Sequence, residues 1–307
     1  MPKVSVIIPI YGVEKYIERC ADSLFAQTLS DMEFIFVDDC TPDSSMELLN
    51  KKIEKNRLHF AEKHWQVRTV RMPTNSGLPA VRRHGIQLAT GDYLIHCDSD
   101  DWPEKDMYEA LYTKAIEGNY DIVFCDYYRS SENQRIAVSE AKCLNEVLLT
   151  GPLWNKLVKR SICVNNHILY PSGNKAEDGV LMVQYSYYST SKAYVQQPLY
   201  NYYVNVDSIT QVKSPEKKLR NLEQEKTNTD IRIAFLEQHH DTERFEKEIA
   251  IWKYNTRMNI LSLMKERMYY DIWRNTYPEL DKRFYVCKYL SIKARISYLL
   301  RRFRILR

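Results

Sequence analysis

Short apolar runs rich in β-branched residues alternate with longer amphipathic segments over the first 130 residues. The apolar runs are residues 4–10, 33–37, 67–71, 93–97 and 121–125. Segments with helical spacing of apolar residues lie between them, at 14–26, 44–63, 79–89 and 104–117. Because strands buried on both faces read as continuous apolar runs, this alternation predicts an α/β fold with a mostly parallel, doubly wound sheet.

The pattern changes further along the chain. Residues 130–142 are polar and irregular, and a helix from about Glu177 and a strand over 193–206 follow. The apolar spacing is helical after Ser214, and Pro215 suits the first turn of a helix. We therefore predict an α/β domain over residues 1–212 and a helical C-terminal region over residues 213–307.

Composition and cysteine usage narrow the class of protein. A chain of 307 residues is long enough for about two domains of roughly 150 residues each. The seven cysteines form no C-x-x-C pair, and their odd number argues against a disulfide framework. No apolar stretch reaches the ~20 residues needed to cross a bilayer, and the N-terminal apolar run is too short for a signal peptide. We expect a cytoplasmic protein.

Positive charge is concentrated at the C-terminal end. The net charge is +4, yet residues 282–307 hold nine Lys and Arg and no acidic residue, so residues 1–281 carry −5. The acidic body argues against a nucleic-acid partner. Within the basic end, apolar residues recur at helical spacing: Tyr285, Tyr289, Ile292, Ile296, Leu299 and Phe303. This pattern predicts an amphipathic helix that lies on an anionic membrane surface, peripheral to its inner face, or one that packs on the catalytic domain.

Candidate chemistry follows three of the predicted strands. Pro9 to Gly12, Asp38-Asp39 and Asp98 to Asp101 come directly after the first, second and fourth strands. Ligands bind beyond the carboxyl ends of parallel strands, so these residues should meet in one cleft. The chain has neither G-x-G-x-x-G nor G-x-x-x-x-G-K-[ST], which argues against dinucleotide binding and P-loop phosphoryl transfer.

The string Asp98-Ser99-Asp100-Asp101 is the most informative of these segments. Mg²⁺ and Mn²⁺ prefer carboxylate oxygens and are commonly shared with substrate phosphates. Residues i and i+2 of an extended segment face the same side, so Asp98 and Asp100 can address one ligand. The alternative is a polar turn in which Asp101 caps a helix that begins at Trp102-Pro103.

The ordered set of motifs resembles family 2 inverting glycosyltransferases of the bacterial cell-surface polysaccharide type. The matching motifs are Ser5-Val-Ile-Ile-Pro-Ile-Tyr11, Val37-Asp-Asp39, Asn75-x-Gly77 with Arg82, Gly91-Asp-Tyr-Leu, Asp98-Ser-Asp-Asp101, Trp154-Asn-Lys156, Glu177-Asp178 and residues 200–210. The resemblance implies a nucleotide-sugar-dependent enzyme with the GT-A fold. It covers residues 3–210 and leaves 215–307 outside.

The resemblance implies roles in binding the nucleotide sugar. Pro9 and Tyr11 would border the base, and Asp39 would accept a hydrogen bond from the uracil imide of a UDP-sugar. Asp98 would contact the ribose, and Arg82 would help to hold the nucleotide. Asp100 would coordinate Mn²⁺ or Mg²⁺ beneath the diphosphate. The chain departs from the family pattern at Cys40 and Arg83, where Gly and Asn are frequent.

The resemblance also implies a catalytic base. Asp178 matches that position, and an inverting displacement needs one base to take the acceptor proton. The alternative is that Glu177 and Asp178 cap a helix. Trp154, Lys156 and Glu177 would lie on the acceptor side, with a sugar stacked on the indole and Lys156 near phosphate or Asp178. For Trp154 and Lys156 the alternative is a packed indole and a solvated ammonium group.

These observations predict transfer of a sugar from a nucleotide sugar, with UDP favoured, to a glycan or lipid-linked acceptor. Two other classes stay open. A phosphatase could use Asp-x-Asp as nucleophile and acid, but it normally carries that pair after its first strand, which here ends Pro9-Ile10-Tyr11. A catalytically silent carbohydrate- or membrane-binding module would not need Asp39, Asp100 and Asp178.

Overall fold

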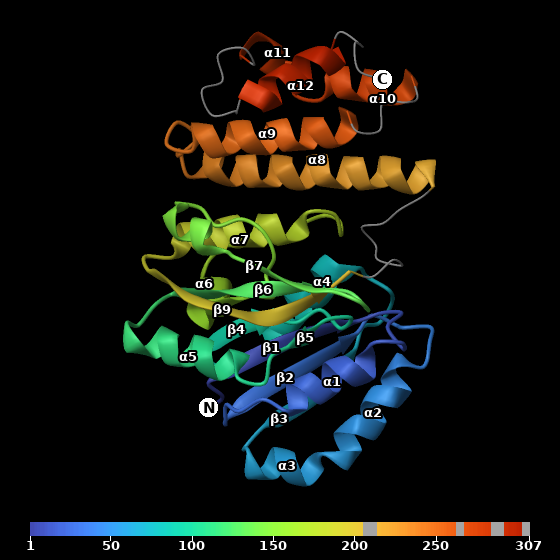
Figure 1. Ribbon diagram of the computed structural model, residues 1–307, viewed down its shortest axis with the longest axis vertical. Helices are drawn as coiled ribbons and strands as arrows, with labels where there is room; N and C mark the ends of the chain where they lie inside the picture. The colour runs from blue at the N-terminus through green and yellow to red at the C-terminus, as the bar shows by residue number, and fades with distance from the viewer. Residues whose placement is uncertain (205–213, 262–266, 284–291, 303–307) are drawn as a thin grey trace. The chain divides into compact units, whose positions relative to one another are not determined.

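The computed structural model describes the chain except for residues 205–213, 262–266, 284–291 and 303–307 (Figure 1). The described residues contain a nine-stranded sheet in the order β3-β2-β1-β4-β8-β6-β9-β5, with β7 beside β6. Its strands are β1 Val4–Ile10, β2 Met32–Asp38, β3 Gln66–Arg71, β4 Tyr93–His96, β5 Trp102–Pro103, β6 Ile122–Ser130, β7 Arg135–Val138, β8 Lys156–Lys159 and β9 Lys192–Tyr203.

The first half of the sheet is the predicted parallel arrangement. Strands β3, β2, β1 and β4 run parallel, and their apolar side chains are buried except in β3, at the edge of the sheet. All five predicted strands exist. The second half is mixed, since β8 is antiparallel to β4 and β6, β5 is antiparallel to β9, and β6 and β9 are parallel.

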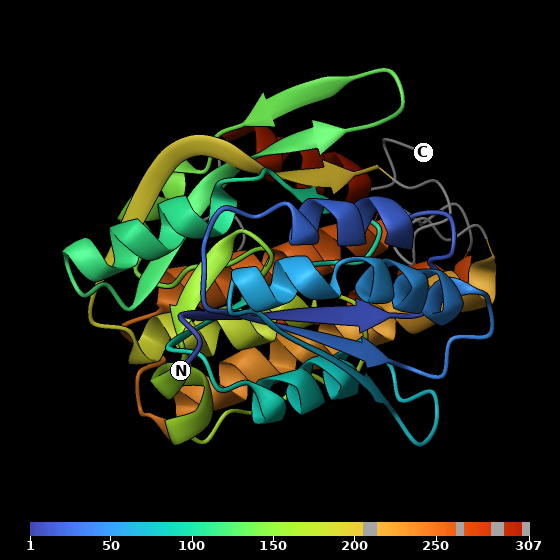
Figure 2. The same cartoon turned by 90° about the horizontal axis from the view of Figure 1, so that it is seen from below.

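The expectation of an irregular segment over residues 130–142 was partly wrong. Strand β6 continues to Ser130 and pairs with β7 in an antiparallel hairpin (Figure 2, green). The side chains of Arg135, Ile136 and Ala137 in β7 are exposed. A strand exposed in this way lacks the apolar alternation that marks a half-buried strand, which is why the sequence pattern did not reveal it.

Helices cover both faces of the sheet, as the doubly wound pattern predicts (Figures 1 and 2). One core packs α1 and α5 on alternate side chains of β1, such as Val6 and Ile8. The other packs α4 on Ile7. These helices are α1 Ile17–Phe25, α2 Ser45–Lys55, α3 Arg57–Glu62, α4 Leu78–Leu88, α5 Met107–Glu117, the 3₁₀ turn η1 Ala141–Asn145, α6 Arg160–Asn165 and α7 Glu177–Tyr188.

The chain divides into two compact units. The first contains Met1–Tyr170 and Leu181–Gln211, and the second contains Pro171–Val180 and Val212–Arg307. Residues 171–180 therefore group with the C-terminal helices, which the predicted division at residue 212 does not include. The described helices of the second unit are α8 Pro215–Gln238, α9 Glu246–Leu261, α10 Arg267–Asn275, α11 Leu280–Arg283 and α12 Ile292–Arg302.

Helical structure after Pro215 was predicted, and the helices pack around an apolar core of their own. Ser214 caps α8 by accepting a hydrogen bond from the Lys217 amide, and Pro215 opens the helix. Leu222, Tyr254 and Trp273 are buried in this core. Among the described residues, no helix combines the length and apolar character needed to cross a bilayer.

One glycine sets the distance between α4 and β1. A Cβ atom at Gly85 would lie 2.4 Å from Cγ2 of Ile7, which is closer than packed atoms tolerate. Gly85→Ala should therefore destabilise the protein by about 1–3 kcal/mol, because overpacking outweighs the better helix propensity of alanine. Urea unfolding measures this effect. In a double-mutant cycle, Ile7→Ala should reduce the cost of Gly85→Ala, and strictly additive effects would contradict the predicted clash.

Candidate active site

The ends of three parallel strands bring the predicted nucleotide-binding residues to one edge of the sheet. In the pairing of β1 with β2, Ile10 lies opposite Asp38, and the backbone N–H of Asp39 donates to the Ile10 carbonyl at 3.0 Å. Strand β4 ends beside β1 on its other side. Pro9 is buried within β1, whereas the Tyr11 side chain is 51% exposed just beyond it.

Asp39 is buried and connects β2 to the start of α4. Its two carboxylate oxygens accept from the backbone N–H groups of Ser76, at 2.7 Å, and Gly77, at 2.9 Å. Gly77 has φ +80° and directly precedes α4, a backbone conformation that glycine adopts without steric cost. The carboxylate therefore fixes the loop that leads into the helix carrying Arg82.

A buried ion pair joins α4 to the acidic loop after β4. Nη2 of Arg82 lies 2.8 Å from Oδ1 of Asp98. The Arg82 side chain is 1% exposed and that of Asp98 30% exposed. A buried guanidinium needs such a charge partner, and the Asp98 side chain is only partly covered. Two residues predicted to hold the nucleotide are thus in direct contact.

The acidic loop is anchored to β9 through Asp101. Its buried carboxylate accepts from the Tyr200 hydroxyl at 2.9 Å and from the Tyr203 N–H at 2.7 Å. Burial raises the pKa of Asp101 well above its usual range, and the charges of Asp100 and Asp98 add to this. The helix-cap alternative was wrong, because Trp102 and Pro103 form β5 and the next helix begins at Met107.

The donor set suits a divalent cation that is shared with a diphosphate. Asp98 and Asp100 are partly exposed carboxylates two residues apart. Among the described residues, no group of three or more His, Cys, Asp and Glu side chains is arranged to hold a metal ion. Mg²⁺ at nucleotide sites is commonly bound by one or two carboxylates while phosphates and water complete its shell, so two carboxylates fit this mode of binding.

Trp154 and Lys156 are buried side chains. The Trp154 ring, 5% exposed, stacks on Tyr200 with centroids 4.4 Å apart and an interplanar angle of 9°. Lys156 Nζ donates to the carbonyl of Pro152 at 3.0 Å and to Oδ1 of Asn155 at 2.8 Å. Trp154 is packed in the interior, as the alternative prediction held. The other part of that alternative, a solvated Lys156, was wrong. Neither side chain is displayed on the surface.

Glu177 and Asp178 form the first turn of α7 and belong to the second unit. Glu177 is 3% exposed, and Asp178 is partly exposed. The positive end of the helix dipole favours a carboxylate at this position. Ala176, directly before the helix, has φ +60°. The role of Asp178 as a base stays a prediction at this point.

Comparisons with known proteins agree with this geometry. Residues 5–173 match Glycosyl transferase family 2. This match spans more than half of the chain. The chain belongs to that family. Among curated relatives, EpsH of Bacillus subtilis, which is named a glycosyltransferase, is 29% identical over 265 residues, covering 81% of this chain and 73% of its own. The chain spans 64% of the length of two further relatives, EpsJ of Bacillus subtilis and YibD of Escherichia coli.

Solved glycosyltransferase structures share the fold. Staphylococcus aureus TarS, residues 1–349 in complex with UDP-GlcNAc, superposes with a TM-score of 0.74 at 20% identity and covers 98% of this chain and 87% of its own. The mannosyltransferase PcManGT of Pyrobaculum calidifontis, in complex with GDP-Man and Mn²⁺, has a TM-score of 0.54 at 13% identity, with coverages of 99% and 85%. The family 2 glycosyltransferase described here therefore has the predicted GT-A fold.

The departure from the family pattern at Cys40 is accommodated locally. Cys40 has φ +58°, in the left-handed region where glycine is favoured. Its Sγ donates to the carbonyl of Met72 at 3.1 Å. The neighbouring Asp38 carboxylate accepts from the Thr41 N–H at 2.7 Å and pairs with Arg71 at 3.0 Å. The turn thus keeps its shape without glycine.

Sequence patterns did not identify Arg19 as part of this site. From α1, its Nη2 donates to the Asp100 carbonyl at 2.8 Å. Its guanidinium carbon lies 3.8 Å from the Trp102 ring centroid and 4.5 Å from that of Tyr203. Arg19 therefore holds the acidic loop through the Asp100 carbonyl and covers Tyr203, whose N–H donates to Asp101. No motif marks it, since an arginine on an amphipathic helix is ordinary.

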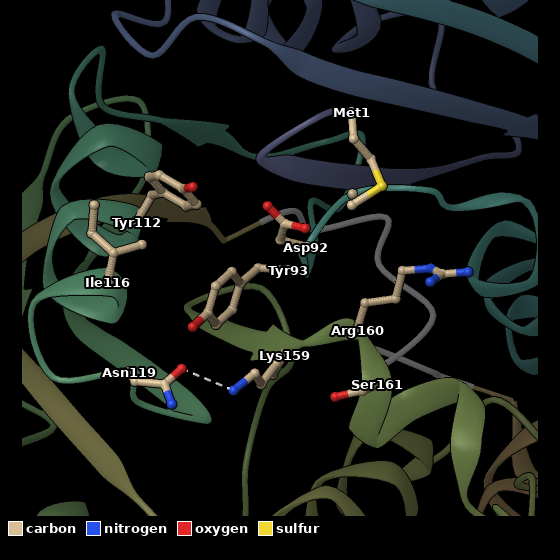
Figure 3. A pocket seen from close by; sticks show the side chains of 10 residues that line it. Met1, Asp92, Tyr93, Tyr112, Ile116, Asn119, Lys159, Arg160 and Ser161 are labelled. Carbon is tan, nitrogen blue, oxygen red and sulfur yellow. Dashed lines mark hydrogen bonds between the residues drawn. The ribbon is translucent and has the colours of Figure 1, made fainter.

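A separate hollow of about 420 Å³ lies at the opposite ends of the strands (Figure 3). Asp92, Tyr93, Lys159 and Arg160 line it, and Lys159 Nζ donates to Oδ1 of Asn119 at 3.0 Å. None of the predicted site residues lines this hollow. It lies where β4 begins, whereas ligands of parallel sheets bind where the strands end.

Proposed function

We propose that this chain transfers a sugar from a UDP-sugar to a hydroxyl group of a glycan or lipid-linked acceptor, with inversion of the anomeric carbon. The observation that carries the proposal is the contact of Arg82 with Asp98 after β4, at the same edge of the sheet as Asp39 after β2, with β1 between the two strands. TarS, with the same fold, was solved with UDP-GlcNAc, which supports a UDP-sugar donor here. Residues 1–212 would form the catalytic domain, and 213–307 the helical region.

The nucleotide would lie along the strand ends. Tyr11, the exposed side chain beyond β1, would border the base with Pro9 behind it. Asp39 would face the uracil imide, so its present backbone partners Ser76 and Gly77 would have to share it or yield. Asp98, whose side chain is 30% exposed, would accept a hydrogen bond from the ribose.

The metal would be held by Asp100, with Asp98 close by, and the bound complex of PcManGT with GDP-Man and Mn²⁺ supports this cofactor class. When bound, Mn²⁺ or Mg²⁺ neutralises the charge that develops on the departing diphosphate. The protein contributes by holding the acidic loop in place, through the hydrogen bond of Arg19 to the Asp100 carbonyl and the hydrogen bonds that Asp101 accepts.

Inversion requires one displacement and one base. The Asp178 carboxylate would take the proton of the acceptor hydroxyl while that oxygen forms a bond to the anomeric carbon. The bond from the anomeric carbon to the UDP oxygen breaks, and UDP leaves with the electron pair. The phosphatase alternative is disfavoured by the family match and by the acidic pair after β4 instead of β1. A catalytically silent binding module is disfavoured by the presence of Asp39, Asp100 and Asp178, which such a module would not need.

The C-terminal end would bring the enzyme to the inner face of an anionic membrane, where a lipid-linked acceptor is available. In α12, Ile292 is 74% exposed and Ile296 51% exposed, and exposed apolar side chains beside Lys293 and Arg295 suit a membrane interface. Tyr285, Tyr289 and Phe303 of the predicted stripe lie outside the described residues.

UDP should stabilise the protein substantially only when Mn²⁺ or Mg²⁺ is present. At 100 times Kd a ligand raises the unfolding free energy by about 2.7 kcal/mol. Asp100→Asn should reduce this metal-dependent part, because it removes an anionic ligand. Thermal shift with UDP, with and without Mn²⁺, measures it, and Asp92→Asn at the opposite end of β4 serves as control. Equal stabilisation of wild type and Asp100→Asn would contradict the role of Asp100.

Asp178→Asn should bind UDP–Mn²⁺ as the wild type does but lose activity. Loss of a general base typically lowers the rate by ~10²–10⁴-fold. Release of UDP from UDP-sugars, with water as acceptor, measures the rate before the natural acceptor is identified. Activity within a few-fold of wild type would contradict this assignment and make Glu177→Gln the next variant to examine.

Charge reversal in α12 should weaken membrane binding. Each basic residue near an anionic surface contributes about 1 kcal/mol, so Lys293→Glu with Arg295→Glu should lower binding by more than 10-fold. Co-sedimentation with phosphatidylcholine vesicles containing phosphatidylglycerol measures this, with vesicles lacking the anionic lipid as control. A chain ending at Asp281 should lose binding as well. Equal, salt-insensitive binding by all forms would leave α12 as a packing helix.

A further inference from the structure

The side chain of Asn228 in α8 forms hydrogen bonds with the loop that precedes α7. The buried Asn228 amide donates from Nδ2 to the carbonyl of Gly173 at 3.0 Å and to that of Lys175 at 2.8 Å. Its Oδ1 accepts from the Ser172 N–H at 3.1 Å. Both amide hydrogens and the oxygen are thus used on three backbone groups within four residues, all inside the second unit.

Residues one turn to either side of Asn228 contact the same segment. Oε1 of Gln224 accepts from the Lys175 N–H at 3.2 Å. A Cβ at Gly173 would lie 2.6 Å from the Gln224 side chain. One turn later, the buried Arg232 donates to Thr229 Oγ1 at 2.7 Å, and its Nη1 lies 3.2 Å from where a Cβ of Gly179 would be.

These three side chains form one face of α8, because residues four apart lie one above the other on a helix. The segment they hold runs from Ser172 to Gly179 and contains Glu177 and Asp178. Ala176, between the held carbonyls and the helix, has φ +60°, a conformation that non-glycine residues keep only where the surroundings enforce it. The contacts of α8 with Lys175 come directly before Ala176.

We propose that Gln224, Asn228 and Arg232 are positioning residues that set the place and direction of the Asp178 carboxylate. The proposal rests on the proposed function, in which Asp178 is the base. The helical region outside the family match would then take part in the chemistry by holding the start of α7. A base displaced by about 1 Å can cost 10²-fold in rate, so the loss of these contacts should lower turnover.

Kinetics and hydrogen exchange test this in the full chain. The donor is whichever of UDP-glucose, UDP-galactose and UDP-N-acetylglucosamine the wild type hydrolyses fastest. The reaction contains Mn²⁺, and water is the acceptor. Asn228→Ala should lower kcat by ~10–10²-fold, leave KM for the donor and Kd for UDP–Mn²⁺ unchanged, and speed amide exchange at Ser172 and Lys175. Thr227→Ala, on the exposed side of α8, should behave as the wild type.

Two variants of Gln224 test the positioning role without changing Asn228, and they decide it if Asn228→Ala does not fold. Gln224→Glu keeps the oxygen that accepts from Lys175 and should retain kcat, whereas Gln224→Ala should lower it. Wild-type kcat in folded Asn228→Ala or Gln224→Ala would overturn the positioning role while Asp178→Asn stays inactive. Activity retained by Asp178→Asn would instead overturn the assigned base, and the positioning role with it. A parallel fall in UDP–Mn²⁺ binding would also contradict the proposal.

Discussion

The candidate donor site depends on one buried electrostatic contact, the pair formed by Arg82 and Asp98. A guanidinium that is almost fully buried must have an anionic neighbour, and Asp98 provides one when the loop after β4 is fixed against α4. That requirement places the acidic loop beside the strand ends that carry Asp39 and Tyr11. Burial lowers the pKa of the adjacent His96 well below its usual range, and the charge of Arg82 adds to this. This shift favours a neutral imidazole beside the Arg82 guanidinium.

The acidic loop itself is held by two sets of contacts that use different chemistry. Arg19 binds a main-chain carbonyl and covers aromatic faces, while Asp101 accepts hydrogen bonds from β9. The four residues of the loop therefore differ in exposure. Asp98 and Asp100 remain partly exposed, whereas Ser99 and Asp101 are buried. A string of carboxylates would repel itself if all were ionised and close, and burying Asp101 among hydrogen-bond donors separates a structural carboxyl group from those that can meet a ligand.

Sequence patterns predicted the parallel half of the sheet because β1, β2 and β4 are buried apolar runs, and β3, although largely exposed, is rich in β-branched residues. They did not reveal β5, β7 and β8. Strand β5 has only two residues, β7 is exposed, and β8 has a lysine at each end, so none of them carries such a pattern. The nucleotide-site residues could be placed since they follow strand ends. Trp154 could not, since burial of its indole depends on Tyr200, which is distant in sequence. Lys156 could not either, since the carbonyl of Pro152 that binds its ammonium group is a backbone atom that no sequence motif records. Arg19 contacts the loop only through a backbone atom, and no sequence motif records that.

The two glycines that face α8 have a consequence for how such enzymes diverge and can be recombined. Gly173 and Gly179 leave room for Gln224 and Arg232, so the shape of the loop and the side chains of the helix are matched to each other although some 50 positions separate them. A chimera that exchanged the C-terminal helices of two relatives at residue 212 would divide this matched pair. Exchange of residues 171–180 together with the helices would keep it intact, which makes a discontinuous segment the natural unit of modular inheritance.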